Sequence, residues 1–73
     1  MRVEMQISGR NKIPGKITEI VVGDVMAKVV MEGPGGTELV AVITSDAVKE
    51  LGLSVGKEVQ ALIKATEIMV IAK

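Results

Sequence analysis

Apolar and polar residues alternate along short stretches of this chain, and glycine-rich or polar turns separate the stretches. Residues 2–8 place Val3, Met5 and Ile7 on one face of an extended segment and polar side chains on the other. Residues 57–65 repeat this pattern with few exceptions. A period of two is typical of strands with one buried face, so the alternation predicts a β protein built from short strands.

The expected elements follow one another with few residues between them. Gly23 and Asp24 separate two β-rich stretches, which indicates a tight hairpin. The one good helix candidate spans residues 45–51, where Thr44 or Ser45 can cap the start and Gly52 can end it. Strands are predicted at residues 2–8, 16–22, 25–32, 39–43, 57–65 and 67–72, and an ordered loop at residues 9–15. This order predicts an all-β fold with one short helix, an OB-like five-stranded Greek-key barrel with the N-terminal strand as an added arm.

The core of this protein has to be built from aliphatic side chains. The 73 residues include no Phe, Tyr, Trp, Cys or His. So short a chain forms a small core, and neither a disulfide nor a His/Cys metal site is available to support it. Residues 39–43 are apolar on both faces of their strand, and Leu62 interrupts an otherwise polar face. These features predict a homo-oligomer whose subunits cover what one chain leaves exposed.

Length and charge narrow the class of protein. One domain spanning residues 1–73 is expected. The formal net charge is +0, so no overall field attracts nucleic acid or a membrane surface. The alternating start is neither a signal peptide nor a membrane span, which favours a cytoplasmic protein with no membrane partner. A nucleic-acid-binding OB domain is a weak alternative, because such domains stack bases on aromatic side chains and this chain has 0% aromatics.

Catalytic chemistry has few candidates here. Without His or Cys there is no imidazole base, thiolate nucleophile or classical triad. The acidic residues are scattered singly, with no pair placed for glycoside hydrolysis or for a metal ion. Residues 33–36 are rich in glycine but lack the Lys-Ser/Thr of a phosphate-binding loop, and we interpret them as a turn. The sequence therefore predicts a protein that is not an enzyme and has neither a bound metal cation nor an organic cofactor.

Two stretches carry the hydrogen-bond donors that an anion needs. They are Ser8-Gly9-Arg10-Asn11, beyond the end of a predicted strand, and Lys64-Ala65-Thr66, between the last two predicted strands. Together they offer guanidinium, ammonium, hydroxyl, amide and backbone N–H groups, which suit a tetrahedral dianion. On their own, such residues are more often turn formers and solvated charges. The residue types alone leave both interpretations open.

The two donor stretches are parts of longer sequence motifs. Ser8-Gly9-Arg10-Asn11 is followed by a short spacer, Gly15 and a strand, and residues 41–44, 48–53 and 56–59 continue the pattern. Ala61-Leu62-Ile63-Lys64-Ala65-Thr66 then precedes a short apolar strand. In this order and spacing the motifs resemble the molbindins, whose opening reads Ser-Ala-Arg-Asn. The resemblance covers nearly the whole chain, although Gly9 stands where the family usually has Ala.

The resemblance implies an OB-like domain that assembles as a hexamer, a trimer of dimers, with first strands exchanged between partners. It also implies that molybdate or tungstate is bound at subunit interfaces, for intracellular storage, buffering or homeostasis of molybdenum. The site residues carried over are Ser8, Gly9, Arg10, Asn11, Lys64, Ala65 and Thr66. The same domain occurs as a regulatory part of molybdate transporters and repressors, so an excised fragment is an alternative. A start at Met1 and the absence of a linker favour an independent protein.

A second kind of site in the family lies near the threefold axis, close to the first hairpin. In this chain the corresponding residues are Gly23, Asp24 and Val25. Residues 24–28 depart from the family's more familiar Ala-Val-Asn-Ala-Glu. A carboxylate at Asp24 repels an oxyanion unless Lys28 or the turn geometry compensates, so this position is the weaker candidate.

Overall fold

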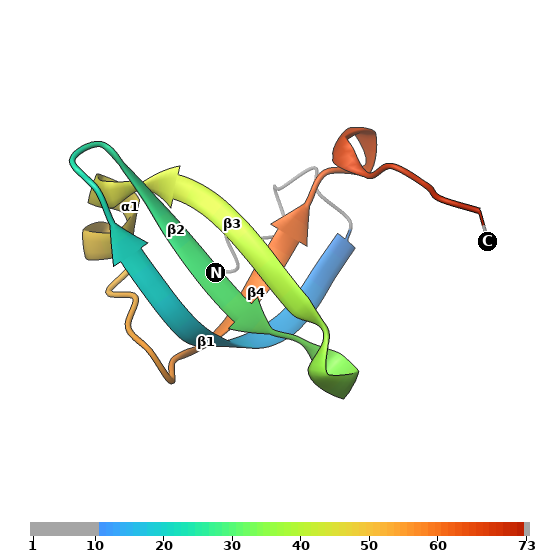
Figure 1. The fold of residues 1–73 in the computed structure, drawn as a ribbon, viewed down its shortest axis with the longest axis horizontal. Helices are drawn as coiled ribbons and strands as arrows, with labels where there is room; N and C mark the ends of the chain where they lie inside the picture. Colours follow the sequence, from blue (N-terminus) through green and yellow to red (C-terminus); the bar gives the residue numbers. More distant parts are fainter. Residues whose placement is uncertain (1–10, 73) are drawn as a thin grey trace, which may run out of the picture.

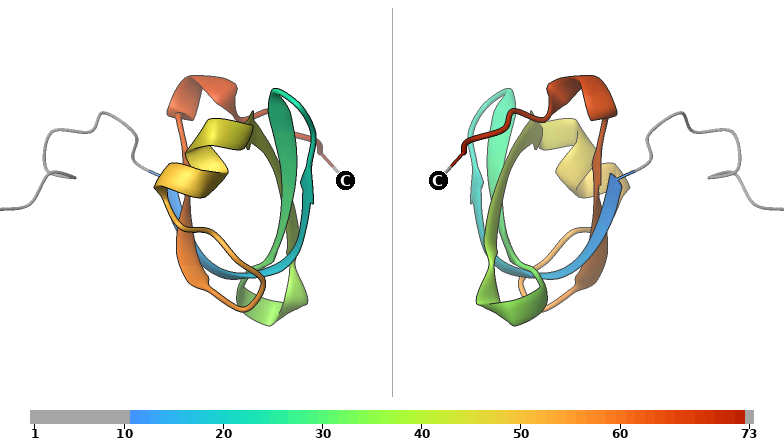
Figure 2. Two further views of the ribbon diagram at one scale, coloured as in Figure 1. Left: turned by 90° about the vertical axis from the view of Figure 1, so that its left-hand side faces the viewer. Right: turned by 90° about the vertical axis from the view of Figure 1, so that its right-hand side faces the viewer.

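The computed structural model of the protein describes residues 11–72, which form one curled antiparallel sheet with short helical segments at its ends (Figure 1). The elements are β1 (Asn11–Val22), β2 (Met26–Glu32), the 3-10 turn η2 (Pro34–Gly36), β3 (Glu38–Thr44), α1 (Ser45–Glu50), β4 (Glu58–Ile63) and the 3-10 turn η3 (Ala65–Glu67). The strand order is β3-β2-β1-β4, and the sheet bends round as an open barrel (Figure 2). This arrangement, mostly strands with one short helix, confirms the predicted fold class. Within residues 11–72 no helix is long and apolar enough to cross a membrane.

Strand β1 joins the two halves of the sheet. Residues 11–16 pair with β4, whereas residues 16–22 pair with β2. The register shifts between Ile17 and Glu19, and the Thr18 hydroxyl donates to the carbonyl oxygen of Val30 at 3.2 Å. Such a bulge bends a strand and increases its twist. It therefore lets one long strand serve both halves of a curled sheet.

The predicted loop at residues 9–15 is wrong for residues 11–15, which belong to β1. Pro14 and Gly15 are residues that usually interrupt a strand. Proline removes one ladder N–H, but at Pro14 β1 pairs with β4 alone, because pairing with β2 begins at Lys16. Gly15 allows close approach of β2, since a Cβ there would lie 3.3 Å from the carbonyl oxygen of Glu32.

The hairpin between β1 and β2 is tied to the first residue of α1. The Gly23 N–H donates to the Met26 carbonyl oxygen at 2.9 Å, and a Cβ on Gly23 would lie only 2.9 Å from that same oxygen. The buried Ser45 hydroxyl donates to the Gly23 carbonyl oxygen at 2.8 Å, and the Ser45 N–H donates to the Val25 carbonyl oxygen at 2.7 Å. The predicted hairpin is confirmed, and α1 holds its turn in place.

Helix α1 begins and ends close to where the sequence predicts. The Thr44 hydroxyl accepts a hydrogen bond from the Ala47 N–H at 3.0 Å, as expected for an N-cap. Leu51 is the C-cap, and Gly52 follows with φ of +64°, a conformation that favours glycine. These local signals suffice to place a six-residue helix.

The core lies on the concave side of the sheet, under α1. Ile17 is 1% exposed, and the alternating β2 residues Ala27, Val29 and Met31 are buried beside it. Val48 of α1 completes the buried cluster. The alternate residues from Ala27 to Met31 therefore form the buried face of β2. Val25, two positions before Ala27, lies in the turn and is exposed.

The chain after β4 differs from the prediction of a strand at residues 67–72. Ala65–Glu67 form η3, and residues 68–72 run on without pairing to the sheet. Apolar alternation predicts a strand locally, but a strand also needs an edge to pair with. Within one chain, η3 directs this segment away from the sheet (Figure 1). The predicted strand at residues 2–8 falls outside the described residues.

Candidate oxyanion-binding site

The start of β1 and the end of β4 meet at one end of the sheet. Asn11 lies opposite Ile63 in the antiparallel ladder, and the Asn11 side-chain amide donates to the Ile63 carbonyl oxygen at 3.2 Å. Lys64 follows Ile63 directly. Asn11 and Lys64, more than fifty residues apart in sequence, therefore lie close together at this end of the sheet. Ser8, Gly9 and Arg10 fall outside the described residues.

The Lys64-Ala65-Thr66 stretch has the backbone geometry of a helical start. Lys64 is extended, with φ of −70° and ψ of 140°, and caps η3. Its carbonyl oxygen accepts from the Glu67 N–H at 2.9 Å. The first N–H groups of a helical turn have no partner within that turn, so those of Ala65 and Thr66 are not used inside η3. All three residues are exposed.

The charges and donors at this end of the molecule suit an anion, with one exception. Lys64 supplies an ammonium group, Thr66 a hydroxyl and Asn11 an amide with a second N–H not used in the bond to Ile63. Glu67 adds a carboxylate in the first turn of η3. Sequence reasoning overlooked this carboxylate, although an acidic residue at a helical start is a recognised signal. An anion held here has to lie on the Lys64 side of the turn, away from Glu67.

The second predicted position lies at the opposite end of β1. In the turn at residues 23–25, the Gly23 N–H is already used by Met26, and the carbonyl oxygens of Gly23 and Val25 are used by Ser45. The turn presents the exposed Asp24 carboxylate, and among the described residues no turn or loop hydrogen bond uses the N–H groups of Asp24 and Val25. A single chain therefore offers an oxyanion few hydrogen-bond donors at this turn. The two predicted positions lie at opposite ends of β1 and are not brought together in one chain.

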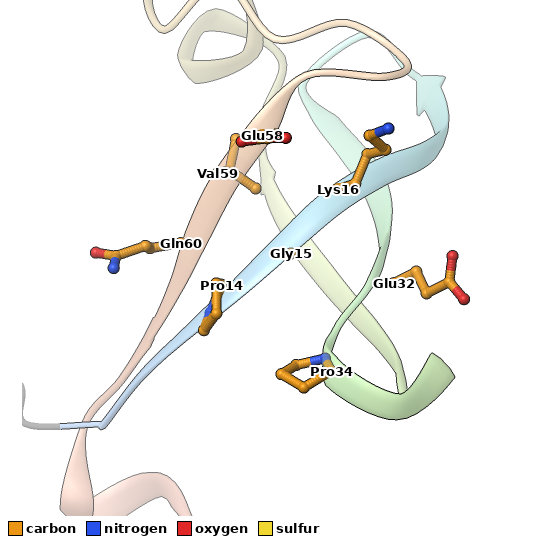
Figure 3. Close-up of a pocket in the computed structure, with 8 residues that line it drawn as sticks. All are labelled: Pro14, Gly15, Lys16, Glu32, Pro34, Glu58, Val59 and Gln60. Atoms are coloured by element: carbon orange, nitrogen blue, oxygen red, sulfur yellow. The ribbon is translucent and has the colours of Figure 1, made fainter.

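A broad hollow on the described surface does not coincide with either position. It is a broad, open depression of about 760 Å³, shown in Figure 3. Lys16 of β1 lies there in register with Glu58 of β4 on one side and Glu32 of β2 on the other. The lining residues are Pro14, Gly15, Lys16, Glu32, Pro34, Glu58, Val59 and Gln60. Two carboxylates against one ammonium make this surface unsuited to a dianion.

Comparison with known proteins places the chain in a family. The model of the TOBE domain matches residues 7–70. The chain is 48% identical over 66 residues to the probable molybdenum-pterin-binding protein of Haemophilus influenzae, which covers 90% of this chain and 96% of that one. It is 56% identical to the solved molybdate-binding protein from Sporomusa ovata, with a TM-score of 0.88 over 93% of this chain and 100% of that one. The cytoplasmic molybdate-binding protein ModG, solved with molybdate bound, is 42% identical with a TM-score of 0.78, over 82% of this chain and 43% of that one. The chain therefore belongs to the TOBE domain family and, within it, to the molbindins that its motifs resemble.

Proposed function

We propose that this protein binds molybdate or tungstate, and that the site is formed by Ser8, Gly9, Arg10, Asn11, Lys64, Ala65 and Thr66. The observation that carries this proposal is the pairing of Asn11 with Ile63, which brings Asn11, the last residue of the first donor stretch, next to the start of the second. The similar proteins are known as molybdate-binding or molybdenum-pterin-binding proteins, which supports the choice of ligand. The function is reversible binding and not catalysis.

The chemistry of the donors explains which anions the site accepts. Arginine, lysine, hydroxyl and N–H groups can all donate to the oxygens of a fully deprotonated dianion. Phosphate near neutral pH carries at least one O–H, which would face other donors and find no acceptor. Sulfate lacks that proton but is smaller than molybdate, so discrimination against sulfate depends on the size of the site.

The proposed biological role is intracellular storage, buffering or homeostasis of molybdenum in the cytoplasm. The functional unit is a homo-oligomer, a hexamer built as a trimer of dimers, in which residues 1–73 form one domain and first strands are exchanged. Exposed apolar side chains on the outer face of the sheet support assembly, because Val40 and Val42 of β3 both remain uncovered in the single chain.

Calorimetric titration tests the proposed function. The apo protein is titrated with molybdate, tungstate, sulfate and phosphate under matched pH and ionic strength. We expect molybdate and tungstate to bind with similar affinity, and sulfate and phosphate to bind much more weakly. Equal binding of all four anions, or no binding of molybdate, would contradict the proposal.

Mixing two defective variants tests whether the Arg10 and Lys64 that bind one anion belong to the same chain or to different chains. We expect them to contact one anion from different chains, whereas the pairing of Asn11 with Ile63 makes an arrangement within one chain the competing geometry. Arg10→Ala and Lys64→Ala subunits are unfolded together, refolded and titrated with molybdate. If Arg10 and Lys64 of one site belong to different chains, mixed oligomers regain some intact sites and bind molybdate again. If they belong to the same chain, every site lacks one of the two residues, and the mixture binds molybdate no better than either variant alone.

A further inference from the structure

The 3-10 turn η3 places a carboxylate next to donors of the proposed site. Glu67 is the last residue of η3, and Lys64 is the residue that caps the start of the turn. The Glu67 N–H donates to the Lys64 carbonyl oxygen at 2.9 Å, so the backbones of these two residues are in contact. Figure 1 shows the turn as a tight coil just beyond the end of β4. An acidic and a basic side chain therefore start from the same turn.

The local benefit of an acid in this turn is small. A carboxylate in the first turn of a helix interacts favourably with the N–H groups there, because the peptide dipoles of the helix add along its axis. η3 has only three residues, and Ile68 after it is extended, with φ of −97° and ψ of 129°. Few peptide dipoles add in so short a turn. The charge of Glu67 therefore has its larger effect on a charged ligand that binds beside the turn.

Two lysines lie at the same end of the sheet as Glu67. Lys12 is opposite Leu62 in the β1–β4 ladder, and Lys64 is two residues beyond Leu62. Both lysines and Glu67 are exposed, so their fields act on a ligand through water and are screened by salt. The lysines attract an oxyanion, and Glu67 repels it. Because the Coulomb energy is proportional to the charge of the ligand, Glu67 opposes a dianion twice as strongly as a monoanion.

We propose that Glu67 is a specificity-determining residue of the oxyanion site, which lowers the affinity for dianions and keeps their binding reversible. Its carboxylate opposes the attraction of the lysines and reduces the preference for a dianion over a monoanion of the same size. A protein that stores or buffers an anion has to release it again, and a built-in repulsion serves that role. This inference rests on the proposed function and concerns a residue outside the seven that form the site.

A series of charges at position 67 tests the proposal. Glu67→Asp keeps the negative charge, Glu67→Gln removes it with little change of shape, and Glu67→Lys reverses it. Each variant is titrated calorimetrically with tungstate at low ionic strength. We expect Glu67→Asp to bind like the wild type, Glu67→Gln to bind about three- to ten-fold more tightly, and Glu67→Lys to gain about the same factor again. Since position 67 is exposed, far-UV circular dichroism should show the same fold throughout.

The charge of the ligand provides a second test with the same variants. Perrhenate is a tetrahedral oxyanion of nearly the size of tungstate, but it is a monoanion, whereas tungstate is a dianion. Because the repulsion is proportional to the ligand charge, the gain for perrhenate in Glu67→Gln should be about the square root of the gain for tungstate, or about two- to three-fold. Perrhenate binding is measured by displacement of bound molybdate. A change in the shape of the site would alter the binding of both anions alike.

Salt and a control variant separate the field of Glu67 from other effects. The Debye length is about 30 Å at about 0.01 M ionic strength and about 3 Å at about 1 M, so the gain in Glu67→Gln should be lost at high salt. Glu58→Gln makes the same change of charge at the other end of β4, about 20 Å along the strand from Lys64. This control should change the tungstate affinity by less than about twofold.

Each possible result decides the role of Glu67. If the wild type binds neither molybdate nor tungstate, the proposed function is wrong and the role of Glu67 is wrong with it. If the wild type binds tungstate but Glu67→Gln shows unchanged affinity, weaker binding or an equal gain for perrhenate, the proposed function stands and the role of Glu67 is wrong. A gain that persists at about 1 M salt also overturns the proposal, because the field of an exposed charge is screened there.

Discussion

Val29 and Val70 carry the same side chain in opposite surroundings. Val29 of β2 is 3% exposed and lies among the core residues, whereas Val70, in the segment of residues 68–72 that follows η3, is 88% exposed. The region around Val29, formed by β1, β2 and α1, buries a cluster of apolar side chains within one chain. The region formed by the end of β4, η3 and residues 68–72 leaves Leu62 and the apolar side chains of residues 68–71 exposed, and it also carries proposed oxyanion donors. One part of the molecule is complete by itself, and the other depends on a ligand and on further copies.

The largest effect is expected in the self-contained region. Ile17→Ala removes the side chain that is 1% exposed at the centre of the core. Truncation of a buried isoleucine costs about 2–5 kcal/mol, through lost burial and the cavity left behind. Chemical denaturation should show this loss in the free energy of unfolding. Val25→Ala, at the exposed hairpin turn, is the control and should change stability by about 0.5 kcal/mol or less. Equal losses in the two variants would remove the distinction between a packed core and an open periphery.

The next effect belongs to the incomplete region. Lys64→Ala removes an exposed ammonium group that packs against no core residue. A charge-assisted hydrogen bond contributes about 1.5–3 kcal/mol, so molybdate affinity should fall about ten- to a hundred-fold while the far-UV circular dichroism spectrum stays the same. Lys49→Ala on α1 makes the same change of charge away from the site and should bind molybdate normally. Unchanged affinity in Lys64→Ala would mean that the site is elsewhere.

A smaller effect is expected at the junction of α1 and β3. Thr44→Ala removes the hydroxyl that accepts from the Ala47 N–H, and loss of such a cap costs about 1 kcal/mol. Thr44→Ser keeps the acceptor and should retain most of the stability. Neither variant should alter molybdate affinity, because this cap and the Lys64 stretch lie on separate elements. A parallel loss of molybdate affinity in Thr44→Ala would show that the two regions are coupled more tightly than we infer.

The difference between the self-contained region and the incomplete region also explains which elements could be predicted from the sequence. The strand at residues 25–32, the strand at 39–43 and the helix at 45–51 agree with β2, β3 and α1 to within one residue at each end. Their signals are local, since alternation and capping act within a few residues. The start of β1 was missed because Pro14 looks like a break, and its tolerance depends on which neighbours pair with β1 at that point. The strand at 67–72 does not form in the described chain, because η3 directs this segment away from the sheet edges with which it would pair (Figure 1).

The candidate site was predicted in part for the same reason. Local chemistry marked Asn11 and Lys64 as possible donors, but nothing local says that positions so far apart become neighbours. Their proximity follows from the β1–β4 register. The carboxylate of Glu67 was missed because η3 was not expected, and only this helical turn places Glu67 in the same turn as Ala65 and Thr66.

The central claim is that the incomplete region is completed jointly by the oxyanion and by other subunits, and a dilution series tests it most directly. Subunit mass and melting temperature are followed together across protein concentrations, with and without molybdate. A ligand that binds only the assembled form stabilises it by about 2.7 kcal/mol per independent site at a hundredfold excess over its Kd, and by linkage dissociated chains bind poorly. We therefore expect molybdate to hold the assembly together at dilutions where the apo protein dissociates, and to raise the melting temperature. If molybdate binds but shifts neither the mass nor the melting temperature at any concentration, the site does not depend on assembly and the claim is wrong.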